Sequence, residues 1–107
     1  MADINRKLSV QRELFFVAID AGELIGTAMG GWDGHRGWVY YVAVRDGARR
    51  RGVGTALMRQ VESALVRLGC NKINLQVRTE DAGVVSFYEK LGYAVEGRIS
   101  MGKKLPA

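Results

Sequence analysis

The first half of the chain contains three short runs of strand-forming residues, separated by turn residues. The runs are residues 13–20, 24–32 and 38–46, and each is rich in Phe, Val, Ile or aromatic side chains. Glycine and aspartate lie between them and favour tight turns. Because the three runs are close in sequence, the pattern predicts an antiparallel meander.

After residue 52 the apolar positions change period. From Val53 to Leu68 they recur three and four positions apart, which predicts an amphipathic helix that ends at Gly69. Residues 72–78 then alternate between apolar and polar, which predicts a strand. Since a helix connects this strand to the run at 38–46, the two strands are expected to be parallel.

A second helix is predicted after Asp81, whose side chain can cap its first turn, and Gly92 ends it. Residues 93–105 are predicted to form a last pair of strands. The fold class is therefore α+β (mixed α/β), with a mixed, mostly antiparallel sheet and helices on both faces. We expect a single domain over residues 1–107, with 1–12 as a short N-terminal helix and 13–107 as the core.

Composition narrows the class of protein. Cys70 is the only cysteine, so no intrachain disulfide can form and no metal-ligand spacing is present, which favours a reducing compartment. The N-terminus lacks a leader-like apolar stretch and no run is long enough to span a membrane, so we expect a cytoplasmic protein. The formal net charge of +5 favours anionic partners, whether nucleotides, cofactors or nucleic acids.

The segment RRRGVG, residues 49–54, lies between a predicted strand and the start of a predicted helix. The first amides of a helix have no intrahelical acceptor, and the helix dipole adds partial positive charge there. Glycines let a ligand approach the backbone, so the segment predicts a phosphate site. The spacing fits neither the Walker A nor the dinucleotide-binding motif. An ordinary loop with solvated arginines is the alternative.

A second segment, SFYEKLGY at residues 86–93, is by itself typical of a helix C-terminus with Phe87, Tyr88 and Leu91 in the core. Together, the two segments resemble the GCN5-related N-acetyltransferases, from about residue 13 onward. Arg49-x-x-Gly52-x-Gly54 matches the acetyl-CoA loop of that family. The YpeA-like acetyltransferases are the subgroup that the chain most resembles, by the segments at 26–44 and 92–105.

The resemblance implies an acetyl-CoA-dependent N-acetyltransferase acting on a small amine or a lysine. It places the pyrophosphate on the amides of residues 51–55 and the pantetheine arm along the strand at 38–46. A backbone amide near that strand would stabilise the oxyanion, and the phenol of Tyr88 would donate to the leaving thiolate. The implied cofactor-binding residues are Val42, Val44, Arg49, Arg51, Gly52, Val53, Gly54, Thr55, Asp81 and Tyr88.

Two positions differ from the family pattern. Family members commonly carry Asn where this chain has Asp81, and members that act on protein N-termini often carry Glu where this chain has Gln76. Because Gln cannot act as a base, a protein N-terminus is less favoured as acceptor. His35, the only histidine, is the candidate catalytic base, with Asp33, a water relay or a deprotonated amine as alternatives.

The chain also begins later than the family pattern, which usually opens with a further strand and one or two helices. The run at 13–20 is therefore expected to be an apolar sheet edge, and such edges pair with something. A homodimer that completes the sheet is one hypothesis, and a truncation is another.

Two other functions compete with acetyl transfer. A non-catalytic acetyl-CoA-binding or regulatory module would keep the cofactor loop without turnover. A small basic nucleic-acid-binding protein would use Arg45, Arg49, Arg50 and Arg51 and show steeply salt-dependent affinity. Against the latter, the other basic residues are scattered and no recognition motif is present.

Overall fold

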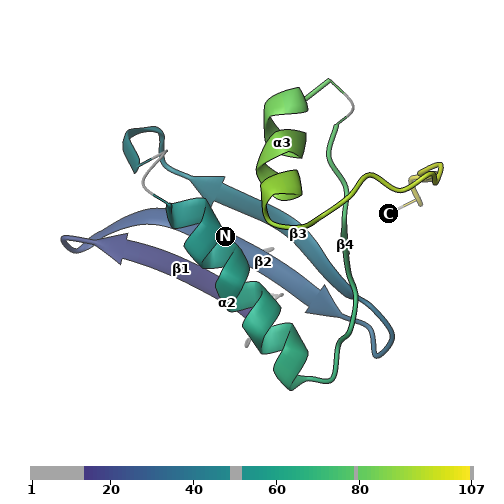
Figure 1. Cartoon of the computed structure of the whole chain (residues 1–107), viewed down its shortest axis with the longest axis horizontal. Coiled ribbons are helices and arrows are strands. Elements are labelled where there is room, and N and C mark those ends of the chain that lie inside the picture. The colour runs from purple at the N-terminus through teal and green to yellow at the C-terminus, as the bar shows by residue number, and fades with distance from the viewer. Residues whose placement is uncertain (1–13, 49–51, 79, 107) are drawn as a thin grey trace. The chain divides into compact units, whose positions relative to one another are not determined.

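The structure of this protein is a computed structural model that describes residues 14–48, 52–78 and 80–106. The chain divides into two compact units, Met1–Gln76 and Val77–Ala107. The first unit contains β1 (Phe15–Asp20), β2 (Glu23–Trp32), β3 (Gly37–Val44), the 3-10 helix η2 (Asp46–Ala48), α2 (Val53–Arg67) and β4 (Ile73–Leu75). The second unit contains α3 (Ala82–Lys90) (Figure 1).

The four strands form one sheet in the order β1-β2-β3-β4. The β1–β2 and β2–β3 pairs are antiparallel, and the β3–β4 pair is parallel. The first hairpin turns at Ala21 and Gly22, whose φ angles are 51° and 79°. Positive φ at both turn residues matches the twist of the flanking strands. The predicted meander and the predicted parallel connection are confirmed.

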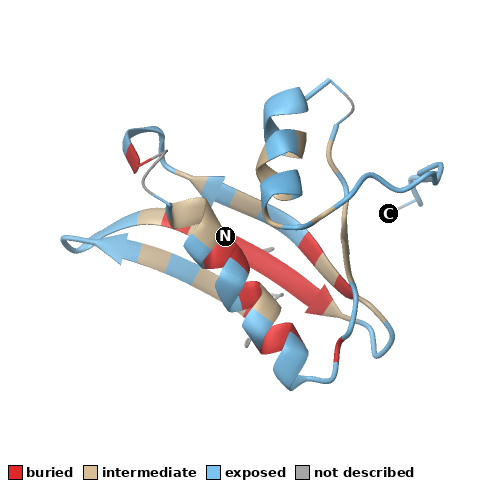
Figure 2. Ribbon diagram, viewed as in Figure 1, coloured by how far each residue is buried: buried red, intermediate tan, exposed pale blue. Residues whose placement is uncertain are grey.

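Helix α2 covers one face of this sheet and contacts β1, β2 and β3. Buried residues follow β2 and the sheet-facing side of α2 (Figure 2). Their side chains form the core of the first unit by the hydrophobic effect. The most deeply buried residues of the first unit are Leu14, Ala28, Ala48, Leu57, Met58, Val61, Ala64 and Leu65.

Three strand glycines, Gly26, Gly30 and Gly37, face α2 and let the helix approach the sheet closely. A Cβ on Gly26 would lie 3.0 Å from a methyl carbon of Leu57, and one on Gly37 would lie 2.8 Å from a methyl carbon of Leu65. Such distances leave no room for a side chain. The glycines that interrupt the strand pattern in the sequence therefore serve helix–sheet packing.

The second unit consists of α3 and the segment that follows it. The carbonyl of Tyr88 accepts hydrogen bonds from the N–H groups of Leu91 and Tyr93, at 3.0 and 3.1 Å. Gly92, with φ of 100°, lies between these two donors. The helix thus ends in a left-handed glycine, as the sequence predicted.

The predicted pair of strands at the C-terminus is wrong. Residues 93–106, all of them described, contain no strand, and a local turn joins the N–H of Arg98 to the carbonyl of Glu96 at 2.8 Å. A strand needs a neighbour that supplies backbone hydrogen bonds, and alternation alone cannot show that one exists. The alternating side chains are correspondingly exposed, as at Ile99 and Met101, each 91% accessible.

The α+β class is confirmed by this mixed sheet with its helices. The strand predicted at 72–78 is reduced to Ile73–Leu75, because its pairing with β3 ends there. The expectation for residues 1–12 falls outside the described residues, and the single-domain expectation stays a prediction. In the described part of the chain, neither α-helix combines the length and the hydropathy that a membrane span requires.

Candidate cofactor site

The N-terminus of α2 carries no side-chain cap. Gly52 is the N-cap residue, with φ of 77°, and the first helical turn contains no acidic residue. Ala56 donates its N–H to the carbonyl of Gly52 at 3.0 Å. The N–H groups of Val53, Gly54 and Thr55 come before that bond, at the positive end of the helix dipole. This helix end therefore suits an anion such as a phosphate group.

Arg49 and Arg51, which were expected to add charge beside this helix end, lie outside the described residues. Their role stays a prediction. The described segment that leads toward them is η2, which is anchored by Ala48. The side chain of Ala48 is 2% exposed, and its N–H donates to the carbonyl of Arg45 at 2.9 Å.

The backbone of β3 points alternately toward β2 and away from it. Arg45 donates its N–H to the carbonyl of Ile25 at 2.8 Å, so this pair is a hydrogen-bonded one. Bonded and non-bonded pairs alternate along an antiparallel ladder. The register therefore places Val42 and Val44 in non-bonded pairs with β2. Their N–H and C=O groups point to the opposite side of β3, where β4 lies.

The β4 strand leaves most of that side open. Its pairing with β3 ends at Val39 and Leu75. The next residue of β3, Tyr40, is the extra residue of a β-bulge in the β2–β3 register, and bulges bend the strand that carries them. Within the described residues, 41–44 have no partner strand on the β4 side. An extended ligand with amide groups can add to this edge as a strand does.

Tyr88 lies on α3, in the second unit. Its ring meets the rings of Phe87 and Tyr93 edge-on, with centroid distances of 5.0 and 5.8 Å. Burial raises the pKa of the Tyr88 phenol above its ordinary value near 10. The hydroxyl therefore keeps its proton at neutral pH and is available as a hydrogen-bond donor.

Asp81 occupies the N-cap position of α3 but does not cap it with its side chain. The predicted side-chain cap is wrong. The backbone of Asp81, with φ of −103° and ψ of 69°, lies outside the β region that a capping residue usually adopts. Its carbonyl still accepts the N–H of Val85 at 3.1 Å. The cofactor-binding role of Asp81 stays a prediction.

The β2–β3 turn is held by the Asp33 carboxylate. One oxygen accepts the N–H groups of Arg36 and His35 at 2.7 and 2.8 Å, and the other accepts the indole N–H of Trp38 at 3.3 Å. The N–H of Arg36, followed by that of His35, lowers the pKa of Asp33. Asp33 is thus a turn-forming residue. An aspartate followed by Gly in a short inter-strand segment is the sequence signal that indicates such a role.

The candidate residues fall into three places. Val42 and Val44 share the first unit with the start of α2, whereas Asp81 and Tyr88 belong to the second unit. His35 is exposed and precedes Gly37, the first residue of β3. The whole length of β3 therefore separates His35 from Val44.

A model of the Acetyltransferase (GNAT) family matches residues 1–93 of this chain. An acetyltransferase of Sodalis glossinidius is 47% identical over 104 residues, which are 96% of this chain and 73% of that relative. An acetyltransferase of Yersinia enterocolitica is 45% identical over 103 residues, with the same coverage of 96% and 73%.

Solved structures with the same fold include Ard1 from Thermoplasma volcanium. Ard1 has a TM-score of 0.83 and is 29% identical to this chain. The match covers 90% of this chain and 66% of Ard1. The aminoglycoside acetyltransferase AAC(6')-Iy, in complex with a bisubstrate analogue of CoA, has a TM-score of 0.85 and 21% identity. That match covers 98% of this chain and 78% of AAC(6')-Iy, and it shows the fold alone.

Proposed function

This chain belongs to the acetyltransferase (GNAT) family, and on that premise we propose that it transfers an acetyl group from acetyl-CoA to a primary amine. The family and the enzyme class predicted from the two motifs are thereby confirmed, and the YpeA-like subgroup stays a prediction. One observation carries the proposal. The uncapped start of α2 and the open edge of β3 belong to the same unit and are joined by a short connection.

The two features suit different parts of acetyl-CoA. The N–H groups at the start of α2 would bind the pyrophosphate, because both the donors and the helix dipole favour negative charge. The outward N–H and C=O groups of β3 would pair with the amides of the pantetheine arm. We propose the following residues for acetyl-CoA binding: Val42, Val44, Arg49, Arg51, Gly52, Val53, Gly54, Thr55, Asp81 and Tyr88.

The residues of this chain would then orient the reactants and stabilise the charge that develops on the carbonyl oxygen and on the leaving sulfur. When bound, acetyl-CoA supplies a thioester, whose C–S bond breaks as the acceptor nitrogen bonds to the carbonyl carbon. An outward N–H of β3, from Val42 or Val44, would donate to the carbonyl oxygen as it gains charge. The Tyr88 hydroxyl would give a proton or a hydrogen bond to the departing sulfur. Because burial raises the pKa of Tyr88, the hydroxyl stays protonated at neutral pH and can act as a hydrogen-bond donor.

His35 is proposed as the final acceptor of the amine proton. Because the length of β3 separates it from Val44, water molecules would carry the proton to it. This role is supported by His35 being the only histidine and by its exposed place in a turn, where water can reach it. A His35→Gln variant tests the proposal. The proposal requires a lower kcat with an unchanged Kd for acetyl-CoA. An unchanged kcat would show that His35 does not accept the proton and that water does.

The acceptor is proposed to be a small amine or a lysine side chain. Gln76 supports this choice over a protein N-terminus, because an amide cannot accept a proton as a base does. A matched panel would contain spermidine, a lysine-containing peptide and a peptide with a free N-terminal alanine. Release of the CoA thiol, followed with a thiol-reactive dye, reports turnover for each.

The test of cofactor binding is calorimetric titration of acetyl-CoA into the protein. We expect the wild type to bind and Gly54→Trp to abolish binding, because an indole at the second helical position would cover the amides. Gly97→Trp is the matched control, since a Cβ on Gly97 would have no neighbour within 4 Å and the residue lies outside the proposed site.

The other outcomes separate the competing functions. Binding without thiol release over the whole acceptor panel would identify a non-catalytic acetyl-CoA-binding module. No binding, together with salt-dependent affinity for DNA or RNA, would favour the nucleic-acid-binding alternative.

Two further expectations are kept as proposals. We propose a homodimer that extends the sheet through β1, whose side away from β2 has no partner among the described strands. We also propose a cytoplasmic location, which the unpaired thiol of Cys70 supports. Fractionation of cells that express a tagged chain tests the location.

A further inference from the structure

Arg45 connects three parts of the first unit. It directly follows β3, and its N–H donates to the carbonyl of Ile25 in β2 at 2.8 Å. Its own carbonyl accepts the N–H of Ala48, which closes η2 at 2.9 Å. Its guanidinium forms an ion pair with the carboxylate of Glu23, with 2.6 Å between Nη1 and Oε2. The backbone and the side chain of Arg45 are therefore both engaged in holding η2 to the β1–β2 hairpin.

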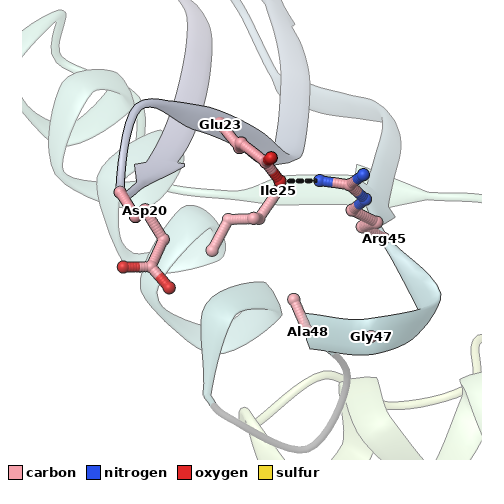
Figure 3. A pocket seen from close by; sticks show the side chains of 7 residues that line it. Asp20, Glu23, Ile25, Arg45, Gly47 and Ala48 are labelled. Atoms are coloured by element: carbon pink, nitrogen blue, oxygen red, sulfur yellow. Dashed lines mark hydrogen bonds and ion pairs between the residues drawn. The ribbon is translucent and has the colours of Figure 1, made fainter.

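The ion pair lies over a cavity of about 390 Å³ between the hairpin and η2. Figure 3 shows Glu23 and Arg45 joined on one side of this space, with Gly47 and Ala48 on the η2 side and Asp20 on the hairpin. Because a cavity separates η2 from the hairpin here, the side-chain pair supplements the backbone bond from Arg45 to Ile25.

The position of η2 bears on the cofactor site. Only three residues separate Ala48, which is 2% exposed, from Gly52 at the start of α2. Since consecutive Cα atoms are about 3.8 Å apart, Ala48 can lie no more than about 15 Å along the chain from Gly52. We therefore expect the position of Ala48 to influence the start of α2.

We propose that Arg45 is a positioning residue for the acetyl-CoA site, acting through Glu23, and that it does not bind phosphate itself. This inference rests on the proposed function of the same site. The carboxylate of Glu23 lies against the Arg45 guanidinium and would repel a phosphate group brought to the same place. Arg45 thus differs in role from the arginines of the RRRGVG segment.

The two possible roles of Arg45 predict opposite signs for one substitution. If Arg45 positions η2, Glu23→Gln and Arg45→Gln each break the same ion pair and both weaken acetyl-CoA binding. If Arg45 binds phosphate, Glu23→Gln removes a competing carboxylate and tightens binding, whereas Arg45→Gln weakens it. Both side chains of the pair are more than half exposed, so we expect a two- to fivefold rise in Kd for each variant.

The calorimetric experiment uses the whole chain and four variants. We expect the double variant Glu23→Gln/Arg45→Gln to bind no more weakly than either single variant, and the charge swap Glu23→Arg/Arg45→Glu to return within twofold of the wild type. At saturating acetyl-CoA, kcat should be unchanged. Arg59→Gln is the matched control, because it breaks an exposed ion pair with Glu62 in α2, at 3.0 Å, outside the site.

Hydrogen exchange at the Ala48 amide tests the inference without acetyl-CoA. We expect Glu23→Gln and Arg45→Gln to speed exchange of this N–H and the charge swap to restore it. If the wild type binds no acetyl-CoA, the proposed function fails, and the exchange rates then decide only whether the Arg45–Glu23 pair holds η2 in place. Tighter or unchanged binding in Glu23→Gln, or unchanged exchange at Ala48 in both single variants, would overturn the inference.

Discussion

The phenol of Tyr88 is partly removed from water, and burial disfavours its ionised form. We expect Tyr88→Phe to lower kcat by about a hundredfold, because loss of a positioned acid typically costs between a hundred- and ten-thousandfold. The Kd for acetyl-CoA should stay within twofold of the wild type, because Phe keeps the ring that packs against Phe87 and Tyr93 and removes only the hydroxyl. Stopped assays of thiol release measure kcat, and calorimetry measures the Kd for acetyl-CoA.

The pH dependence at this residue has a definite sign. Only the protonated phenol can donate, and burial holds the pKa of Tyr88 above its ordinary value near 10. The wild-type kcat should therefore persist through neutral pH and decline only at pH values above that ordinary value. Tyr88→Phe should lack this decline. A wild-type decline well below pH 10, still present in Tyr88→Phe, would assign it to another group.

The contact between α2 and β3 depends on an absent side chain. A Cβ on Gly37 would lie 2.8 Å from a methyl carbon of Leu65 and 2.9 Å from the sulfur of Cys70. Leu65 is fully buried and Cys70 is 8% exposed, so neither can move aside freely. We expect Gly37→Ala to lower the free energy of unfolding by about 1–3 kcal/mol, the usual range for overpacking.

Denaturant titration of Gly37→Ala against Gly47→Ala checks that expectation. A Cβ on Gly47 would have no neighbour within 4 Å, so this control should stay within about 0.5 kcal/mol of the wild type. Equal destabilisation of the two variants would show that the loss of glycine itself, and not the crowding by α2, is responsible.

Elements with strong periodicity could be predicted from the sequence, and elements that depend on a distant partner could not. Residues 53–67 repeat at the helical period, so α2 was found nearly to its ends. Residues 93–105 alternate as a strand does, yet the described chain gives them no neighbouring strand. A local pattern carries no information about whether a partner is present.

At the proposed site, the sequence could predict elements of the backbone but not the side-chain contacts. The start of α2 follows from the helical period of the sequence, whereas Val42 and Val44 were implied by the family resemblance. Which of their groups point away from β2 depends on the strand register, which only the structure shows. The engagement of Asp33 in its turn and the pairing of Arg45 with Glu23 do not follow, because each depends on where a side chain points in three dimensions.

For the molecule as a whole, the edge of β1 bears on the oligomeric state. Thr27 forms a hydrogen-bonded pair with β3, so its N–H and C=O groups point away from β1. Val17 lies opposite Thr27 in β1, and its own N–H therefore points away from β2. The side chains of Val17 and Ile19 are 48% and 59% exposed. We expect the chain to form a dimer at micromolar concentration through this edge.

Light scattering coupled to size exclusion measures the mass. Val17→Pro should give a monomer with an intact fold, since proline is tolerated on an edge strand when its missing N–H would face solvent. Ala18→Pro is the contrasting variant, because the N–H of Ala18 points toward β2 and its loss should destabilise the sheet. A wild type that elutes with the mass of one chain contradicts the dimer.

The outward edge of β3 also determines which substitutions would affect the proposed binding of acetyl-CoA. Val42 and Val44 pair with Ala28 and Gly26, so their side chains share the sheet face that α2 covers. Their peptide groups alone are presented to a molecule added along the strand. We therefore expect apolar substitutions at these two positions to change the stability of the fold and to leave the Kd for acetyl-CoA unchanged. If the proposed site is correct, apolar substitutions at Val42 and Val44 would leave acetyl-CoA binding unchanged, because the backbone alone would form the contacts.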